Sequence, residues 1–282
     1  MTNDGWELTL NTRNIQTSDF SWTTNINLGF NRNEVLNESV AENATYPGRE
    51  GYPVGAIFAY KTAGLDADGY PLFVAADGSL QTAAEFLKLN RFGASTLTAE
   101  EQRNQYTYMG TTDPKCSGGF INNFEYRDWQ LGVGFMFNLG MKVRVQPSYS
   151  PTYYDRGLNT NQDILRRRSA TNPAGDMATL MVSTPERSSE YTRYAEYNTY
   201  AMLDTWVRSS NYCRLQSLRL GYRLPRQWLS PYGISSVTLS LEGRNLAVIA
   251  SDYDNYLDPE TMGNPYAQPI ARSFIFGLNV NF

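Results

Sequence analysis

Apolar residues alternate with polar or small residues along seven stretches of the chain. A period of two is typical of β-strands whose two faces meet different surroundings. The clearest stretch runs from Trp129 to Leu139, where every second residue is apolar and the positions between are glycine, asparagine, glutamine or methionine. The seven predicted strands cover about 5–14, 19–33, 118–126, 129–139, 208–224, 235–249 and 271–282.

The links between the predicted strands alternate between short and long. Two long polar stretches, near 34–117 and 147–207, follow the second and the fourth strand. Within the first of them we expect a strand-like piece over 54–61 and a short helix inside 77–104. Outer-membrane barrels have short periplasmic turns and longer extracellular loops. This alternation therefore predicts extracellular long loops and a chain end on the periplasmic side.

The last predicted strand is apolar at every second position and ends on an aromatic residue. A soluble sandwich strand with one buried face would show a similar alternation. Five consecutive steps and the final phenylalanine favour a membrane barrel, because they resemble the C-terminal signal by which bacterial barrels are recognised for assembly. The residues of this predicted assembly signal are Phe274, Phe276, Leu278, Val280 and Phe282.

Composition supports the same fold class. Aromatic residues make up 13% of the 282 residues, while charged residues make up only 18%. No run approaches the 18 apolar residues that a membrane helix needs, so any membrane span must be a strand. We predict an all-β, antiparallel transmembrane barrel.

Seven or eight strands are too few for the whole predicted barrel. Bacterial single-chain barrels normally have an even number of strands, and an open sheet edge in lipid leaves backbone groups unsatisfied. Residues 1–5 also show no secretion signal, although an outer-membrane protein must be exported. We therefore expect residues 1–282 to be one C-terminal barrel portion of a longer, processed or split protein.

The residues for most enzyme chemistry are missing. Without histidine there is no Ser-His-Asp or Cys-His arrangement, and the commonest metal ligand is lost. Cys116 and Cys213 lack metal-ligand spacing, although a disulfide is allowed in an oxidising compartment. Residues 66–69 resemble part of a calcium loop but lack the distal glutamate, which favours a plain turn. We predict no enzyme activity, no metal, no cofactor and no nucleic-acid surface.

Short segments along the whole chain show a family likeness. They are 5–12, 19–22, 52–58 with 63–66, 117–120, 215–225, 243–246, 257–260 and 273–282. In this order they resemble the C-terminal portion of SusC/RagA-type TonB-dependent outer-membrane transporters. The resemblance implies a 22-stranded barrel with an N-terminal plug, a segment that binds the TonB complex, and a SusD-like surface lipoprotein that captures oligosaccharides or peptides. The plug, the coupling segment and about two thirds of the barrel strands of that family are not in this sequence.

The predicted function is therefore a part of an energy-coupled importer in the bacterial outer membrane. Its expected partners are the remaining barrel and plug, the surface lipoprotein, the TonB complex and the lipid bilayer. A passive porin-like or adhesin-like barrel is the alternative, and it would lack a plug. A soluble all-β binding module is a third possibility, which predicts solubility without detergent.

Two groups of residues are candidates for specific roles. Arg219 and Glu242 lie on the polar-face parity of neighbouring strands, and we expect a structural ion pair in the barrel lumen. Tyrosines in the second long stretch are candidates for stacking on sugar rings or packing against the lipoprotein. The alternative is that they pack the stretch on itself or lie at the membrane interface. These tyrosines are Tyr153, Tyr154, Tyr191, Tyr194, Tyr197 and Tyr200.

Overall fold

A computed structural model describes residues 1–145, 162–179, 197–252, 257–264 and 266–282. The chain divides into two compact units. The first, here called the sheet unit, comprises Met1–Glu34, Asp113–Met141 and Ser209–Phe282. The second, the insert unit, comprises Val35–Thr112 and Lys142–Arg208. No helix in the described part of the chain is long and apolar enough to cross a membrane.

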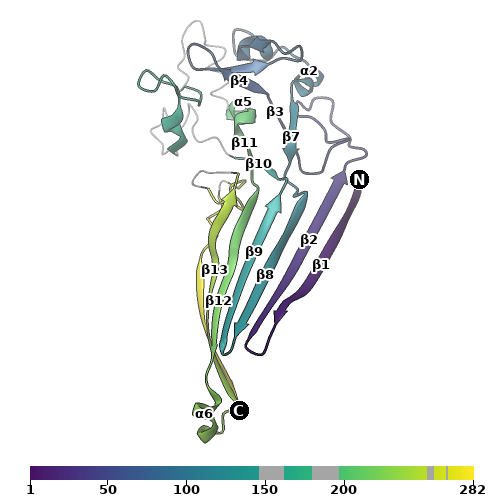
Figure 1. The fold of residues 1–282 in the computed structure, drawn as a ribbon. Helices are drawn as coiled ribbons and strands as arrows, with labels where there is room; N and C mark the ends of the chain where they lie inside the picture. The colour runs from purple at the N-terminus through teal and green to yellow at the C-terminus, as the bar shows by residue number, and fades with distance from the viewer. Residues whose placement is uncertain (146–161, 180–196, 253–256, 265) are drawn as a thin grey trace. The chain divides into compact units, whose positions relative to one another are not determined.

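The sheet unit is built on one antiparallel sheet of seven strands (Figure 1). Each strand pairs with its neighbours along the sequence, in the order β1-β2-β8-β9-β12-β13-β14. The prediction of a large antiparallel sheet is confirmed, with strand boundaries that differ from the predicted ones by a few residues. The strands are β1 (Thr2–Gln16), β2 (Phe20–Glu34), β8 (Cys116–Tyr126), β9 (Trp129–Leu139), β12 (Tyr212–Arg223), β13 (Ser236–Ser251) and β14 (Ser273–Asn281).

Two of the short links are tight turns, as the sequence pattern predicts. The backbone N–H of Thr17 donates to the carbonyl of Phe20 at 2.8 Å and closes the β1–β2 link. Arg127 adopts a positive φ of 54° in the two-residue link between β8 and β9. The third short link, 224–235, is longer and holds α6 (Arg226–Leu229) and the 3₁₀ turn η3 (Ser230–Tyr232).

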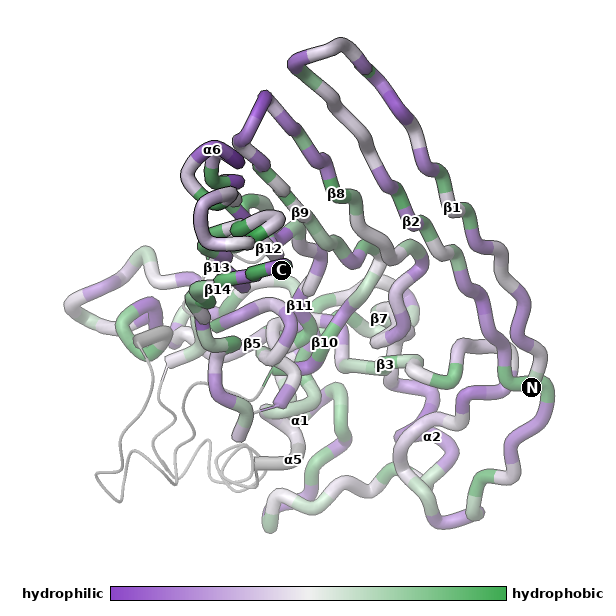
Figure 2. The backbone as a smooth tube through the Cα atoms, turned by 90° about the horizontal axis from the view of Figure 1, so that it is seen from below, coloured by the Kyte–Doolittle hydropathy of each residue, from purple (hydrophilic) through white to green (hydrophobic). Residues whose placement is uncertain are grey.

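The register gives the sheet two chemically different faces. Trp6, Phe30 and Cys116 lie side by side on one face, and their sequence neighbours point to the other. Figure 2 shows the resulting alternation of hydrophobic and hydrophilic positions along the strands. Asn122 interrupts the apolar face, as the sequence indicates. Its side-chain oxygen accepts hydrogen bonds from Trp22 at 3.0 Å and Thr24 at 2.7 Å, so the polar group is satisfied.

The insert unit contains short elements from both long stretches. The expected strand within 54–61 is β3 (Ala56–Ala59), and it pairs with β7 (Thr107–Thr111). The expected helix within 77–104 is present as two short helices, α1 (Ala83–Phe86) and α2 (Ala99–Asn104). The remaining elements are β4 (Thr62–Leu65), β5 (Pro71–Val74), β6 (Leu80–Gln81), β10 (Lys142–Arg144), η1 (Gln162–Arg166), α5 (Tyr197–Tyr200), η2 (Asp204–Trp206) and β11 (Val207–Ser209).

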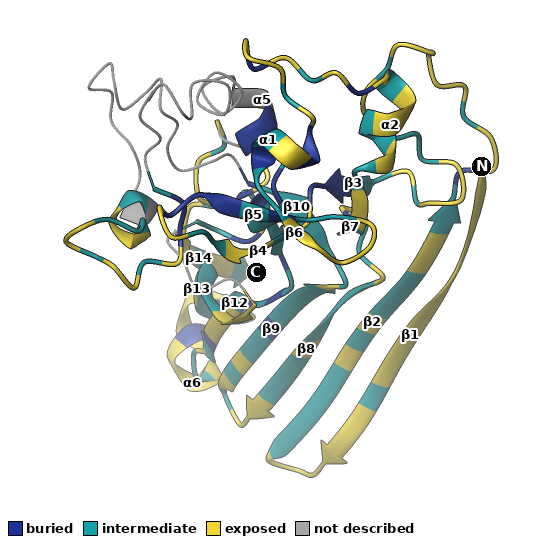
Figure 3. Ribbon diagram, turned by 90° about the horizontal axis from the view of Figure 1, so that it is seen from above, coloured by how far each residue is buried: buried dark blue, intermediate teal, exposed yellow. Residues whose placement is uncertain are grey.

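The two long stretches share one hydrophobic core inside the insert unit. Phe73 and Trp206 come from different stretches, and their exposed fractions are 0% and 1%. The backbone of Tyr60 exchanges hydrogen bonds with Met202 and Asp204, at 2.8 and 2.9 Å. Figure 3 shows buried segments gathered around β3, β5 and α5. Sequence periodicity identifies these stretches only as long polar loops, because their apolar residues follow no regular period.

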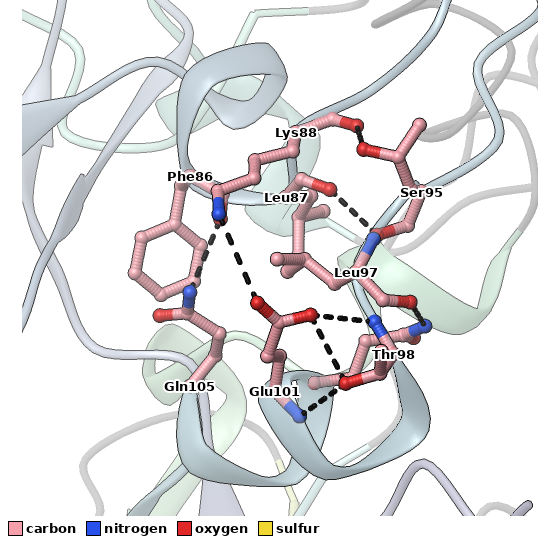
Figure 4. Close-up of polar contacts among 10 residues, drawn as sticks. Phe86, Leu87, Lys88, Ser95, Leu97, Thr98, Glu101 and Gln105 are labelled. Carbon is pink, nitrogen blue, oxygen red and sulfur yellow. Dashed lines mark hydrogen bonds and ion pairs between the residues drawn. The ribbon is translucent and has the colours of Figure 1, made fainter.

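The two helices of the insert unit begin with the same motif. Thr82 and Thr98 are N-caps, and each forms a capping box with the glutamate three residues later. Figure 4 shows the second box and its links to the end of α1. The side chain of Gln105 donates to the carbonyl of Phe86 at 3.3 Å, and the hydroxyl of Ser95 donates to that of Leu87 at 2.6 Å. These bonds join helices too short to be stable alone.

Candidate functional site

The polar face of the sheet is the first candidate for functional contacts. One row crosses all seven strands and combines two arginines and a glutamate with threonine, asparagine, glycine and isoleucine. Such side chains offer donors and acceptors to a polar solute, and small residues leave room beside the backbone. The members of this row are Arg13, Thr23, Asn123, Gly132, Arg219, Glu242 and Ile275.

Arg219 and Glu242 are directly opposite each other on β12 and β13. The carboxylate of Glu242 accepts a hydrogen bond from Nε of Arg244, two residues along its own strand, at 2.6 Å. Arg219 and Glu242 are therefore within reach of each other, as predicted. The ion pair that is present joins Glu242 to Arg244. The Arg219–Glu242 ion pair stays a prediction.

Arg214 is the centre of a buried charged cluster that sequence reasoning missed. Its side chain is only 3% exposed, and Nε lies 2.5 Å from an oxygen of Glu260. A terminal nitrogen lies 2.6 Å from Oδ1 of Asp258. Two charge-assisted hydrogen bonds satisfy the desolvated guanidinium. The cluster fastens the β13–β14 loop to β12.

A signal for this cluster is visible in the sequence in retrospect. Arg214 has the same parity along the chain as the apolar residues Leu218 and Leu220, so a charged residue there stands out and needs acidic partners. The register shift between Leu215 and Ser217 places it opposite Met136, on the polar face. Residues 257–260 supply them from within a family-like segment. Nothing in a single sequence states that these two segments meet.

The apolar face carries aromatic residues in a row near the short links. Phe20, Tyr126, Trp129 and Tyr222 are successive partners across four strands. Trp129 packs on Tyr222 with ring centroids 4.6 Å apart. Rows of tyrosine and tryptophan are typical of a membrane interface, because their rings are apolar and their N–H or O–H groups remain in water.

A second aromatic pair, Trp6 and Phe30, lies toward the other end of this face, with ring centroids 4.2 Å apart. Ten residue steps separate Phe20 from Phe30 along β2. At about 3.3 Å per residue this is ~33 Å of strand, and a tilt of about 40° reduces it to ~25 Å of height. The apolar band of outer-membrane barrels has that height.

Four residues of the predicted assembly ladder lie on this same apolar face of β14, and Phe282 follows the last residue of the strand. Phe274 and Phe276 are each 72% exposed, Leu278 is 61% exposed and Phe282 is 89% exposed. Val280 is opposite Val237 of β13. The apolar residues of the ladder therefore alternate along β14 as the sequence predicts, and their role in assembly stays a prediction.

The six predicted contact tyrosines are only partly described. Tyr153, Tyr154, Tyr191 and Tyr194 lie outside the described residues, as does the side chain of Tyr197. Tyr200 is 5% exposed and makes an edge-to-face contact with Trp206 at 5.4 Å. The position of Tyr200 fits the alternative in which these tyrosines pack the stretch on itself.

The remaining candidates are simple structural features. Oδ1 of Asp66 accepts hydrogen bonds from the backbone N–H groups of Asp68 and Tyr70, both at 2.9 Å, as in a plain turn. Cys116 and Cys213 are free thiols. Within the described ranges, no three acidic or cysteine side chains gather as a metal site would require.

Comparisons with known proteins relate the chain to one kind of membrane protein. No protein-family model matches it. The TonB-dependent receptor P3 of Formosa agariphila is 25% identical over 309 aligned residues, which cover 99% of this chain and 28% of that protein. The TonB-dependent receptor SusC of Bacteroides thetaiotaomicron is 20% identical over 305 residues, with 99% and 26% covered.

The fold has relatives among solved structures. A structure of the RagAB peptide transporter superposes with a TM-score of 0.71 at 21% identity and covers 99% of this chain and 29% of that one. This chain therefore spans somewhat more than a quarter of the length of the relatives it matches. These relatives are receptors and transporters rather than enzymes, and TonB-dependent receptors are outer-membrane proteins. The chain is therefore similar over nearly its whole length to the SusC-type TonB-dependent receptors in sequence, and to part of the RagAB peptide transporter in fold.

Proposed function

We propose that residues 1–282 form a C-terminal part of the barrel wall of a TonB-dependent importer. The observation that carries this proposal is the two-faced sheet. Its apolar face remains exposed and is about as high as a bilayer core between its aromatic residues, whereas its polar face has the chemistry of a lumen wall. Exposing so large an apolar face to water costs free energy, whereas contact with lipid does not.

The edges of the sheet indicate that further strands complete the barrel. In the described part of the chain, β1 and β14 each pair with only one neighbour. An open edge in lipid leaves N–H and C=O groups unsatisfied, at several kcal/mol per group. We place additional strands beside both edges, in a barrel of about 22 strands with a plug.

We further propose that the insert unit is extracellular and that a SusD-like surface lipoprotein binds over it. Both stretches of this unit leave the sheet from the end opposite the short links, which is the extracellular end in outer-membrane barrels. The imported substrates are oligosaccharides or peptides. The peptide class has support from the related RagAB peptide transporter, and the oligosaccharide class has support from the resemblance to SusC-type transporters.

The alternative is a passive porin-like or adhesin-like barrel. Uptake of fluorescent oligosaccharides and peptides by cells with the native protein separates these functions. An importer requires TonB, so deleting TonB or adding a protonophore abolishes uptake, and deleting the lipoprotein lowers it. Uptake that persists without TonB would establish the passive barrel. If deletion of the native protein abolished surface adhesion and left uptake unchanged, the protein would be an adhesin.

A further inference from the structure

The link between β12 and β13 differs from the other two short links at the same end of the sheet. It contains α6 and η3, where the others are turns of a few residues. Leu229 packs inward and is 6% exposed, whereas Trp228 and Tyr232 are 58% and 79% exposed. This link therefore presents two large aromatic side chains to its surroundings.

The charge of this link is also one-sided. Arg223 and Arg226 are both exposed, and no aspartate or glutamate occurs from 223 to 235. Neither arginine forms an ion pair within the ranges that the structure describes. In contrast, Arg127 in the β8–β9 turn lies 3.7 Å from the carboxylate of Asp19 in the β1–β2 link.

The link begins where the aromatic row of the apolar face ends. Tyr222 belongs to that row, Arg223 is the next residue, and α6 begins three residues later. If the row marks the membrane interface, Arg226, Trp228 and Tyr232 lie at the depth of the lipid headgroups, whereas Arg223 has the parity of Arg219 and belongs to the polar face. Basic side chains are attracted to anionic headgroups there, and tryptophan and tyrosine partition into the same layer.

We propose that residues 224–235 form a lipid-binding anchor that recognises anionic phospholipid headgroups on the periplasmic side of the outer membrane. Arg226 contacts the phosphates, and Trp228 and Tyr232 lie at the boundary with the acyl chains. The anchor fixes the depth of β12 and β13 in the bilayer. This inference rests on the proposed barrel function, because it requires the sheet to cross a membrane.

Tryptophan fluorescence tests the lipid-binding anchor and the proposed barrel separately. The native protein is placed in nanodiscs of phosphatidylethanolamine and phosphatidylglycerol with brominated acyl chains, which quench nearby tryptophan. Comparison with the variants W129F and W228F isolates the signal of each residue. We expect quenching of both Trp129 and Trp228. Quenching of Trp129 without Trp228 overturns the anchor alone, whereas quenching of neither overturns the proposed barrel as well.

Arg226 is tested through lipid selectivity. We expect R226Q to weaken enrichment of phosphatidylglycerol over phosphatidylcholine by about fivefold, and high salt to reduce the enrichment. The matched control is R127Q, a basic residue at the same end with an acidic partner, which leaves the enrichment unchanged. Equal effects of R226Q and R127Q overturn the proposal. Protection of Trp228 by a periplasmic protein instead of lipid also overturns it.

Discussion

The sheet unit and the insert unit bury their apolar residues in opposite ways. Phe73 in the insert unit is fully buried and stacks on Phe86 at 4.9 Å. Phe276 in the sheet unit is 72% exposed, although it belongs to a regular strand. The insert unit has a core of the kind found in soluble domains. In the sheet unit, hydrogen bonds between strands hold the backbone, and lipid is the expected partner of the apolar face.

Changes to apolar residues should therefore affect the free energy of unfolding differently in the two units. The effect depends on whether protein or lipid surrounds the side chain. Four experiments test this comparison.

The largest effect is expected from Phe73→Ala in the insert unit. Removing a fully buried ring leaves a cavity and should lower the free energy of unfolding of this unit by about 3–5 kcal/mol. Hydrogen exchange or limited proteolysis of the native protein in detergent measures this loss. The control is Phe92→Ala, whose ring is 68% exposed and should matter little. Equal effects of the two variants would contradict a separate core.

A charge on the apolar face tests the sheet unit. Leu218 lies on this face opposite Val133, near the middle of the predicted apolar band. Leu218→Arg should cost about 2–4 kcal/mol in a bilayer, measured by reversible unfolding from vesicles. Asn25→Arg changes an exposed residue of the polar face and should be nearly neutral. A barrel wall is ruled out if Asn25→Arg is the more costly change.

Asp258→Asn tests the buried charged cluster of the sheet unit. The change removes one of two carboxylates that neutralise Arg214 and should cost about 1.5–3 kcal/mol, the range for hydrogen bonds to charged groups. The same unfolding experiment measures it. We expect the β13–β14 loop to become more sensitive to protease, while Asp4→Asn, an exposed residue of β1, leaves it unchanged. Unchanged protease resistance in Asp258→Asn would show that the cluster does not hold the loop.

The smallest effect concerns the capping box of α2. Thr98→Ala should destabilise the insert unit by about 1 kcal/mol. Hydrogen bonds from the backbone and side chain of Thr98 lower the pKa of Glu101 from its ordinary value of 4.5. The stabilisation that the Glu101 carboxylate gives to the capping box is therefore complete above pH 4.5. It is lost as the pH falls through the lowered pKa of Glu101.

Hydrogen exchange of α2 against pH measures this loss. The variant Glu101→Gln should remove the pH dependence, and Glu100→Gln, which changes the neighbouring acid, should keep it. A pH dependence that survives Glu101→Gln would assign the effect to another group.

Much of the sheet unit could be predicted from the sequence. The alternation at Trp129–Leu139 specifies both the strand and its two faces, because side chains of a strand point alternately to opposite sides. Short links then force neighbouring strands to pair in an antiparallel sheet. One predicted strand was too long, since 208–224 spans β12 and the last two residues of β11. The side-chain oxygen of Asn211 between them accepts hydrogen bonds from Gly140 and Met141.

The sequence by itself therefore determined the strands, their two faces and their antiparallel pairing. The period of two that reveals them follows from the local geometry of a strand and needs no distant contact. The tertiary structure alone decided which polar stretches meet. Thr62 donates a hydrogen bond to Asp204, 142 residues away, and Arg214 reaches Asp258 and Glu260 across a loop. Such contacts depend on how loops close in space and on the cost of burying charges without partners, and neither leaves a periodic trace in the chain.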